Sequence, residues 1–419
     1  MILFPIIFST LTFCSQNSKQ EKTAGNSLPE FLMEAGKTPD ELYQAAEAGD
    51  AHSQWLLGQC YQCGMGFPQD ESLAVTWFLK AAEQNLPNAW YELGNCYYTG
   101  IGVEQNDAEA IRWFRKGADA GGARSQFYMG LCSLYGRGVP QDNAEAFLWF
   151  LMSAEQGFPT SQYEVGVFYA LGIEVAPDAE EAFRWYRLAA EQGQPFAQCN
   201  LGICYQNGTG VEQNAEEAVK WYRLAAEQGD ALAEYNLALC YLEGMDEVEG
   251  MELLHAAAEH GEVSAQYYLA HCYQSGKGVS RDEAEAVKWY TLAAEQGDMY
   301  AQCNLGLCYQ NGAGVEQSDE EAVKWYRLAA KQGDSQALYN LAGCYALAHG
   351  VPKDEAQAFR WFQMSAVLGH AGAQYELGVC YYFGMGVERD EAEGLKWLHR
   401  SAEQGNLDAR ERLAEFEKK

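Results

Sequence analysis

The sequence predicts an all-α solenoid of ten helix-turn-helix repeats, and three observations support this prediction. Tryptophan recurs every 36 residues from Trp77 to Trp221 and again from Trp289 to Trp397. A second column of apolar residues, nine of them cysteine, keeps the same period. A glycine or an asparagine closes every period. A repeat length in the thirties is typical of stacked helical hairpins, in which each repeat packs on its neighbours.

Ten full repeats are expected, with a partial repeat at each end. Their predicted bounds are residues 50–85, 86–121, 122–157, 158–193, 194–229, 230–261, 262–297, 298–333, 334–369 and 370–405. The repeat at 230–261 is the strongest irregularity, because its inter-helix loop is four residues shorter and Leu253 replaces the tryptophan. Residues 40–49 are expected to form a capping half-repeat and residues 406–419 a capping helix, which cover the terminal apolar faces.

Each repeat carries two segments with the apolar spacing of an amphipathic helix. In the first segment Leu201, Cys204 and Tyr205 fall on one helical face, and in the second Trp221 and Leu224 do so. These faces are predicted to form the core. A column of glycine that changes to alanine in some repeats is expected to allow close packing between the two helices.

The ends of the second helix are marked by two columns of residues. A short side chain with an oxygen acceptor precedes the helix in every repeat, which predicts an N-cap. The N-cap column is Asp70, Asn106, Asp142, Asp178, Asn214, Asp246, Asp282, Ser318, Asp354 and Asp390. Nine of the ten have Glu or Gln three residues later, which predicts a capping box. The glycine or asparagine that follows the helix is expected to adopt the left-handed conformation.

The sequence predicts no catalytic residue, no cofactor and no metal site. Nine of the 13 cysteines lie in one core column, one repeat apart and too distant for disulfides, so they are expected to act as small core hydrophobes. The seven histidines are scattered and lack the spacing of a zinc site. The acidic pairs at the starts of second helices favour the helix dipole, and no nucleophile–base pair is evident.

The charge balance excludes nucleic acid as a partner. Asp and Glu total 59 against 28 Lys and Arg, a formal net charge of -31. Such a chain repels the phosphates of nucleic acids and of anionic lipids. We therefore expect a protein or peptide partner, basic if it is charged, and membrane association only through a lipid anchor.

The N-terminal residues resemble a targeting segment. Residues 1–14 are almost wholly apolar or small up to Cys14, as in a signal peptide, although a cationic start is missing. Residues 11–14 resemble the processing box of bacterial lipoproteins, which makes Cys14 the candidate lipidation site, although Phe13 departs from that pattern. Residues 15–39 then form a polar tether. We expect an exported protein, lipid-anchored to the bacterial envelope; the alternative is a cytoplasmic protein with a disordered N-terminus.

The repeat columns are similar to those of the Sel1-like repeat (SLR) family, relatives of the tetratricopeptide repeat. The resemblance is carried by residues 201–205, 208–211 and 217–229, and a near copy runs through residues 305–333. It implies a right-handed α/α superhelix whose first helices line the concave side. It also implies adaptor roles in protein complexes and signalling, and contacts with other cells for exported members. Some exported relatives have a cysteine pair in each repeat, whereas this chain keeps one.

The face of the first helix opposite the core is the candidate binding surface. Its residues vary among the repeats and are rich in Tyr and Asn, which combine contact area with adaptable hydrogen bonds. The predicted partner-binding residues are Tyr91, Glu92, Tyr98, Tyr128, Glu164, Asn200, Asn236, Tyr268, Asn304, Asn340, Glu376 and Tyr382. The alternative for the Tyr91 column is that it only fills space between adjacent first helices.

These observations favour a non-catalytic protein–protein interaction scaffold, which binds a peptide or protein partner in the groove along the first helices. One alternative is an exported, cell-wall-associated enzyme or ligand-binding protein. It requires a repeat that departs from the pattern towards chemistry, and the short repeat at 230–261 loses a loop without gaining an acid–base pair. A second alternative is a structural spacer, which needs no specific partner.

Overall fold

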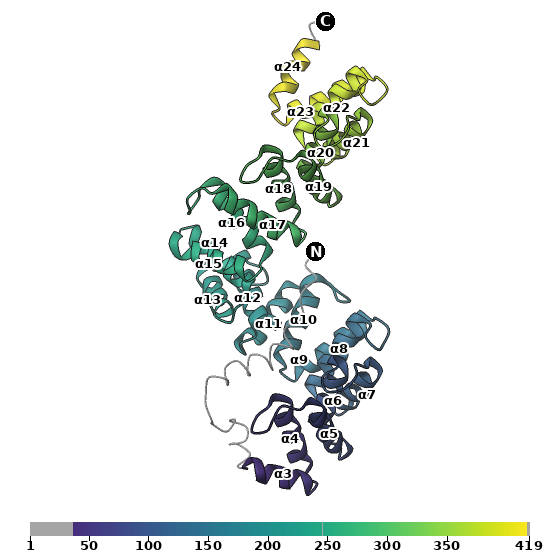
Figure 1. Cartoon of the computed structure of the whole chain (residues 1–419), viewed down its shortest axis with the longest axis vertical. Coiled ribbons are helices and arrows are strands. Elements are labelled where there is room, and N and C mark those ends of the chain that lie inside the picture. Colours follow the sequence, from purple (N-terminus) through teal and green to yellow (C-terminus); the bar gives the residue numbers. More distant parts are fainter. Residues whose placement is uncertain (1–36, 245, 417–419) are drawn as a thin grey trace. The chain divides into compact units, whose positions relative to one another are not determined.

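The computed structural model describes residues 37–244 and 246–416 (Figure 1). These residues form 22 α-helices and no strand, which confirms the predicted all-α repeat fold. The expected signal segment with Cys14, and the tether up to residue 36, lie outside the described residues. Within the described ranges, every helix is too short or too polar to cross a membrane.

The chain divides into two compact units, the first ending at Ala218 and the second beginning at Val219. The helices before this division are α3 (Pro39–Glu47), α4 (Ala51–Cys63), α5 (Glu71–Glu83), α6 (Pro87–Thr99), α7 (Asp107–Asp119), α8 (Ala123–Tyr135), α9 (Asn143–Glu155), α10 (Pro159–Leu171), α11 (Ala179–Glu191) and α12 (Pro195–Asn207), and the division falls within α13 (Ala215–Ala226). Those after it are α14 (Ala231–Leu242), α15 (Glu247–Glu259), α16 (Val263–Ser275), α17 (Glu283–Glu295), α18 (Met299–Asn311), α19 (Asp319–Lys331), α20 (Ser335–Leu347), α21 (Glu355–Val367), α22 (Ala371–Phe383), α23 (Glu391–Glu403) and α24 (Leu407–Phe416).

Within each unit the helices pack in the order of the chain. Even-numbered helices from α4 onward are the first helices of the repeats, and odd-numbered helices from α5 are the second helices. A first helix such as α20 packs on its own second helix α21, which in turn packs on the first helix of the next repeat, α22 (Figure 1). Each unit is therefore a stack of helical hairpins, as expected for a solenoid.

The residue directly after each tryptophan position lies at the centre of the core of its repeat. This column was not predicted from the sequence. This column is Phe78, Phe114, Phe150, Tyr186, Tyr222, Leu254, Tyr290, Tyr326, Phe362 and Leu398, and all are buried. The prediction that Leu224 belongs to the core is wrong, because its side chain is 37% exposed. Trp221 is half-buried. The apolar face of the second helix is thus centred closer to Tyr222 than to Leu224.

The glycine column of the first helix allows the close approach predicted for it. A Cβ atom added at Gly94 would lie 2.4 Å from a ring carbon of Phe114, the buried aromatic residue of the following helix. The same is true of Gly306, where the distance to the Tyr326 ring would be 2.6 Å. The aromatic ring therefore rests directly on the backbone of the first helix.

All ten predicted N-caps form, but the predicted capping boxes do not form as expected. The Asp354 carboxylate, for example, accepts a hydrogen bond from the Gln357 amide at 2.9 Å. In five of the ten second helices the glutamate expected to bond back to the N-cap instead pairs with a Lys or Arg three residues later, as Glu321 does with Lys324. A box with both hydrogen bonds forms at Thr38, which caps α3.

The predicted left-handed residues after the second helices also form. Asn85 has φ 60°, and the nine glycines of its column have φ between 82° and 98°. The cysteine column is buried as predicted, with Cys240 half-buried. Burial raises the pKa of the Cys132 thiol to about 12, so this thiol stays protonated and behaves as an apolar group.

Buried glutamines connect consecutive second helices, a feature that the repeat columns contain but that the sequence interpretation missed. The Gln156 amide donates to the Gln126 side chain at 2.6 Å, and Gln126 donates to the Ala118 carbonyl at 3.3 Å. Equivalent pairs form in five other repeats. In the short repeat the same two positions hold Glu234 and His260, which lie 2.7 Å apart. Each pair satisfies a buried helix-end carbonyl or amide and fixes the spacing of the stack.

Candidate functional site

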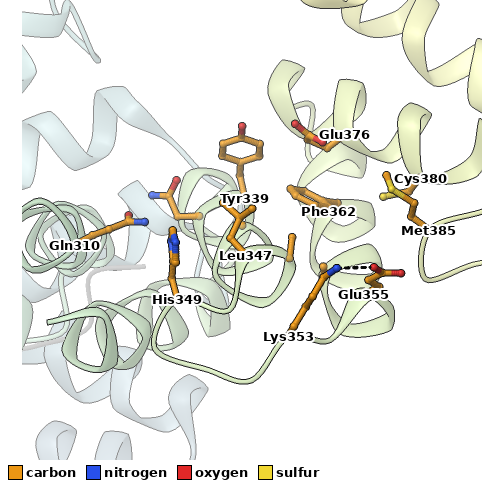
Figure 2. A pocket seen from close by; sticks show the side chains of 14 residues that line it. Gln310, Tyr339, Leu347, His349, Lys353, Glu355, Phe362, Glu376, Cys380 and Met385 are labelled. Atoms are coloured by element: carbon orange, nitrogen blue, oxygen red, sulfur yellow. Dashed lines mark hydrogen bonds and ion pairs between the residues drawn. The ribbon is translucent and has the colours of Figure 1, made fainter. Parts of the chain in front are cut away.

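The second unit contains a pocket of about 370 Å³ between α18, α20, α21 and α22 (Figure 2). It is lined by Gln310, Tyr339, Asn340, Gly343, Ala346, Leu347, His349, Lys353, Glu355, Ala358, Phe362, Glu376, Cys380 and Met385. Two of the predicted partner-binding residues, Asn340 and Glu376, therefore lie in one pocket.

The pocket exists because α20 has small residues at two positions, one where every other repeat carries a larger side chain and one where most do. Gly343 occupies a position where the other nine repeats have Gln59, Asn95, Leu131, Val167, Ile203, Leu239, His271, Leu307 and Val379. A Cβ atom added at Gly343 would meet no heavy atom within 4 Å, so the missing side chain leaves open space. Three residues later Ala346 stands where the adjacent repeats have Gln310 and Tyr382. The space between adjacent first helices is thus left unfilled at α20.

Apolar and aromatic groups form the walls of the pocket. Phe362 is buried, and the Tyr339 ring lies 5.8 Å from it, centroid to centroid. Tyr339 also stacks on His370 at 4.6 Å, which fixes the orientation of its ring. Leu347 lines the opening and is 66% exposed. Figure 2 shows Tyr339 and Glu376 towards one end of the pocket and His349 and Lys353 towards the other, with Leu347 and Phe362 between.

The charged groups of the pocket differ in their pairing. Lys353 forms an ion pair with Glu355 at 2.9 Å, so these two charges balance each other. Glu376 is half-buried and has neither a hydrogen bond nor an ion pair with any described residue. Its burial, together with the charge of Asp408, raises the pKa of Glu376, while Arg412 opposes this rise. The Arg412 guanidinium itself donates to the Tyr375 hydroxyl and to Glu415.

The backbone beside the pocket is strained. Helix α20 ends at Leu347, and its C-cap Ala348 has a φ of 62°, which lies in the left-handed region. The same position holds glycine in eight other repeats: Gly64, Gly100, Gly136, Gly172, Gly208, Gly276, Gly312 and Gly384. An alanine in this conformation costs about 1–2 kcal/mol relative to glycine. Leu347 and His349, the residues on either side of Ala348, both line the pocket.

In the first unit, several predicted site residues are part of the core instead. Tyr128 is buried and stacks on Phe114 at 4.9 Å, and Tyr91 lies 5.5 Å from Tyr128. Here the Tyr91 column fills space between first helices, which was the alternative interpretation. Glu92 is also buried and accepts a hydrogen bond from Gln59 at 3.3 Å. These residues offer a partner little accessible surface.

Two first-unit side chains have unusual electrostatic surroundings. Glu164 is 2% exposed and forms no hydrogen bond or ion pair with a described residue, and burial raises its pKa to about 8. Tyr98 lies under the Arg137 guanidinium at 3.6 Å from the ring centroid, and Arg137 also pairs with Asp107 at 2.7 Å. The first unit thus already holds a cation between a tyrosine face and a carboxylate.

The remaining predicted residues are half-buried and partnered within the chain. Asn304 donates to the Tyr290 hydroxyl at 3.4 Å, and Tyr268 accepts from Lys277 at 3.2 Å. Tyr382 stacks on Phe416 of α24 at 3.8 Å. Asn200 and Asn236 are also half-buried, the former beside Tyr186. None of these five lines the pocket around Gly343.

The repeat at 334–369 holds a second irregularity that was not predicted, besides the predicted one at residues 230–261. Its signal is present in the columns, because Gly343 interrupts a column of larger residues and Ala348 interrupts a column of glycine. His349, Leu347 and Lys353 lie in this irregular segment or directly after it. No group of three or more side chains able to hold a metal ion occurs in the part of the chain that the structure describes.

Comparison with known proteins agrees with the repeat pattern. The Sel1 repeat model matches ten segments of the chain. They are residues 51–86, 87–122, 123–158, 159–194, 195–230, 231–262, 263–298, 300–334, 335–370 and 371–406. No curated protein matches the sequence.

Two solved structures support the same relationship. One is a protective antigen present in uropathogenic Escherichia coli strains that displays an SLR fold. It is 34% identical, with a TM-score of 0.71, over 95% of this chain and 88% of that chain. The other is a Sel1 repeat protein from Oxalobacter formigenes, 32% identical with a TM-score of 0.53, over 73% of this chain and 90% of that chain. The chain therefore belongs to the Sel1 repeat family, whose repeats form scaffolds for protein interactions.

Proposed function

We propose that this protein is a non-catalytic scaffold that binds an extended segment of a protein partner along the first helices of its second unit. In this proposal the pocket around Gly343 receives one side chain of the partner. The observation that carries the proposal is the pocket itself, which arises where one repeat departs from the pattern that the others share.

The departures around the pocket are unfavourable for the fold, which argues against a passive spacer. A glycine within a helix costs about 0.5–1 kcal/mol relative to alanine. Ala348 in the left-handed conformation costs more, and the unfilled space forfeits packing energy. These costs all arise within residues 343–348. Local violations of this kind are typical of functional sites.

The role of the pocket can be tested with a substitution whose side chain fills it. Gly343→Leu restores the size of side chain that the neighbouring repeats carry, and its Cβ meets no atom within 4 Å. Peptides that bind the full chain would first be selected from a random nonapeptide display library. We expect Gly343→Leu to weaken binding of the selected peptides at least tenfold, measured by fluorescence anisotropy.

The matched control is Ile203→Leu, which changes the same column in a repeat without this pocket and keeps the size of the side chain. It should bind the peptides as the natural chain does. Melting temperatures of both variants establish that they are folded. Unchanged affinity of Gly343→Leu for every selected peptide would overturn the proposed role of the pocket.

We further propose that the chain is exported and lipidated at Cys14, which the apolar run at residues 1–14 supports. Metabolic labelling with a fatty acid should modify the natural chain and leave Cys14→Ser unlabelled. Equal labelling of both would contradict lipidation at this cysteine.

A further inference from the structure

We infer that the pocket around Gly343 selects a lysine or arginine side chain of the partner, with the aliphatic stem against Leu347 and Phe362 and the cationic end at Glu376. This inference rests on the proposed function and specifies the chemistry of its occupant. It combines the position of an unpaired carboxyl group, the apolar walls of the pocket and the volume available.

The volume suits one long side chain. About 370 Å³ lies at the lower end of the range of small-ligand sites, which is about 300–1,000 Å³. The pocket is also bounded by two consecutive first helices, α20 and α22, and by α21 between them. A side chain that enters here leaves its backbone outside, along the first helices, as the proposed function requires.

The charges favour a cation. Of the two carboxyl groups that line the pocket, Glu355 is already paired with Lys353, whereas Glu376 has no pairing partner among the described residues. Arg412 is the cation near Glu376, but its hydrogen bonds go to Tyr375 and Glu415. A half-buried carboxylate without a partner is unfavourable, and a cation from the partner would relieve this cost through a charge-assisted hydrogen bond. An acidic side chain would meet repulsion from Glu376 and from Asp408.

The walls fit the rest of a basic side chain. Lysine and arginine bury their methylene groups on apolar surface while the charged end stays in a polar environment. Leu347, Phe362 and Met385 provide such a surface, and Tyr339 adds an aromatic ring near Glu376. A cation over a tyrosine face gains further stabilisation.

The first unit provides an internal example of the same arrangement. Arg137 lies over the ring of Tyr98 and pairs with Asp107, so tyrosine and carboxylate hold one guanidinium together. Tyr98 belongs to the same column as Ala346 of the pocket. At the pocket, Tyr339 and Glu376 provide the tyrosine and the carboxyl group, and we infer that the partner provides the cation.

The test uses acetylated nonapeptide pools whose central residue is Lys, Arg, norleucine or Glu, with flanking positions mixed from Ala, Ser, Tyr and Asn. The immobilised full chain is incubated with equal amounts of each pool at about 0.15 M salt, where exposed charges more than about 8 Å apart are screened. Mass spectrometry measures what is retained. We expect the Lys and Arg pools to be retained at least tenfold more than the norleucine pool, and the Glu pool least.

Two variants test whether Glu376 causes the preference for the Lys and Arg pools. Glu376→Gln should remove the preference for Lys and Arg while retaining the norleucine pool. The control Glu316→Gln removes the same charge from an exposed position outside the pocket and should keep the preference. If Glu376→Gln still prefers the basic pools, the preference comes from the overall acidity of the chain, and the inference is overturned.

The outcomes also separate this inference from the proposed function. Equal retention of the Lys and norleucine pools, abolished by Gly343→Leu, would overturn the inference and leave the proposed binding pocket intact. Retention of every pool unchanged by Gly343→Leu would overturn the role of the pocket itself. Failure of the natural chain to retain any pool would count against both.

Discussion

At the scale of single residues, the repeat depends on a contact between a glycine and a ring. Gly306 of α18 lies against Tyr326 of α19, and both residues are fully enclosed by their neighbours. In the preceding repeat the same two positions hold Ala270 and Tyr290, so the fold accommodates one methyl group here after a small shift. The tyrosine hydroxyl is satisfied by a hydrogen bond, and that of Tyr326 donates to the Gln310 side chain at 2.7 Å.

We therefore expect Gly306→Ala to lower the free energy of unfolding by about 1 kcal/mol and Gly306→Val by about 3 kcal/mol, because each overpacks the core. The matched control is Gly343→Ala, the same substitution in the next repeat but in the adjacent column, where no atom lies within 4 Å. It should raise the free energy of unfolding by about 1 kcal/mol through helix propensity. Urea denaturation measures both, and a stabilising Gly306→Ala would contradict the packing argument.

Glu164 makes stability depend on pH. Burial raises its pKa from 4.5 to about 8 in the folded chain, so the folded state keeps a proton that the unfolded state has lost. Stability must therefore fall as the pH rises from about 4.5 to about 8. The next two repeats carry asparagine in this column, Asn200 and Asn236, so we expect an amide to be tolerated at this site.

We expect Glu164→Gln to unfold like the natural chain near pH 4 and to be more stable by about 4–5 kcal/mol near pH 8.5. Urea midpoints across this pH range provide the measurement. The exposed Glu155→Gln is the control and should not change the pH dependence. An equal effect of Glu164→Gln at both pH values would show that its carboxyl group does not titrate as described.

At the scale of the helices, caps decide where each element begins and ends. The N-caps follow directly from short side chains that reach the first amides of the helix. The C-cap of most first helices is glycine, whereas that of α20 is Ala348. Ala348 lies beside the proposed pocket, and its neighbours Leu347 and His349 line that pocket.

Ala348→Gly should raise the free energy of unfolding by about 1 kcal/mol, because glycine adopts a φ of 62° without steric cost. Thermal denaturation of the full chain measures the change. As a control, Ala356→Gly, at an exposed helical position of α21, should instead destabilise by about 0.5–1 kcal/mol. If Ala348→Gly were also destabilising, Ala348 would not be strained.

At the scale of the whole molecule, stability is built from contacts between consecutive helices. Within each unit, helices pack mainly on the helices directly before and after them. In such an arrangement a local defect weakens its own repeat and the adjacent ones more than distant repeats.

Tyr326→Ala removes a fully buried ring, which should cost about 3–5 kcal/mol. Amide hydrogen exchange, read peptide by peptide, should rise in α18–α20 much more than in α6–α8. Tyr300→Ala, which truncates a tyrosine that is 52% exposed, is the control and should leave exchange nearly unchanged. A uniform rise along the chain would mean that both units unfold together.

The sequence by itself determined the fold class, the helix ends and the cysteine column. A strict period repeats each signal ten times, and short-range caps depend only on neighbouring residues. The core contacts needed the tertiary structure, because Tyr222 and Leu224 both suit an amphipathic helix and only packing buries one of them. The tertiary structure also determined which predicted residues form the site. Asn340 and Glu376 were predicted among twelve similar residues, but they share a pocket because Gly343 leaves the space between them empty.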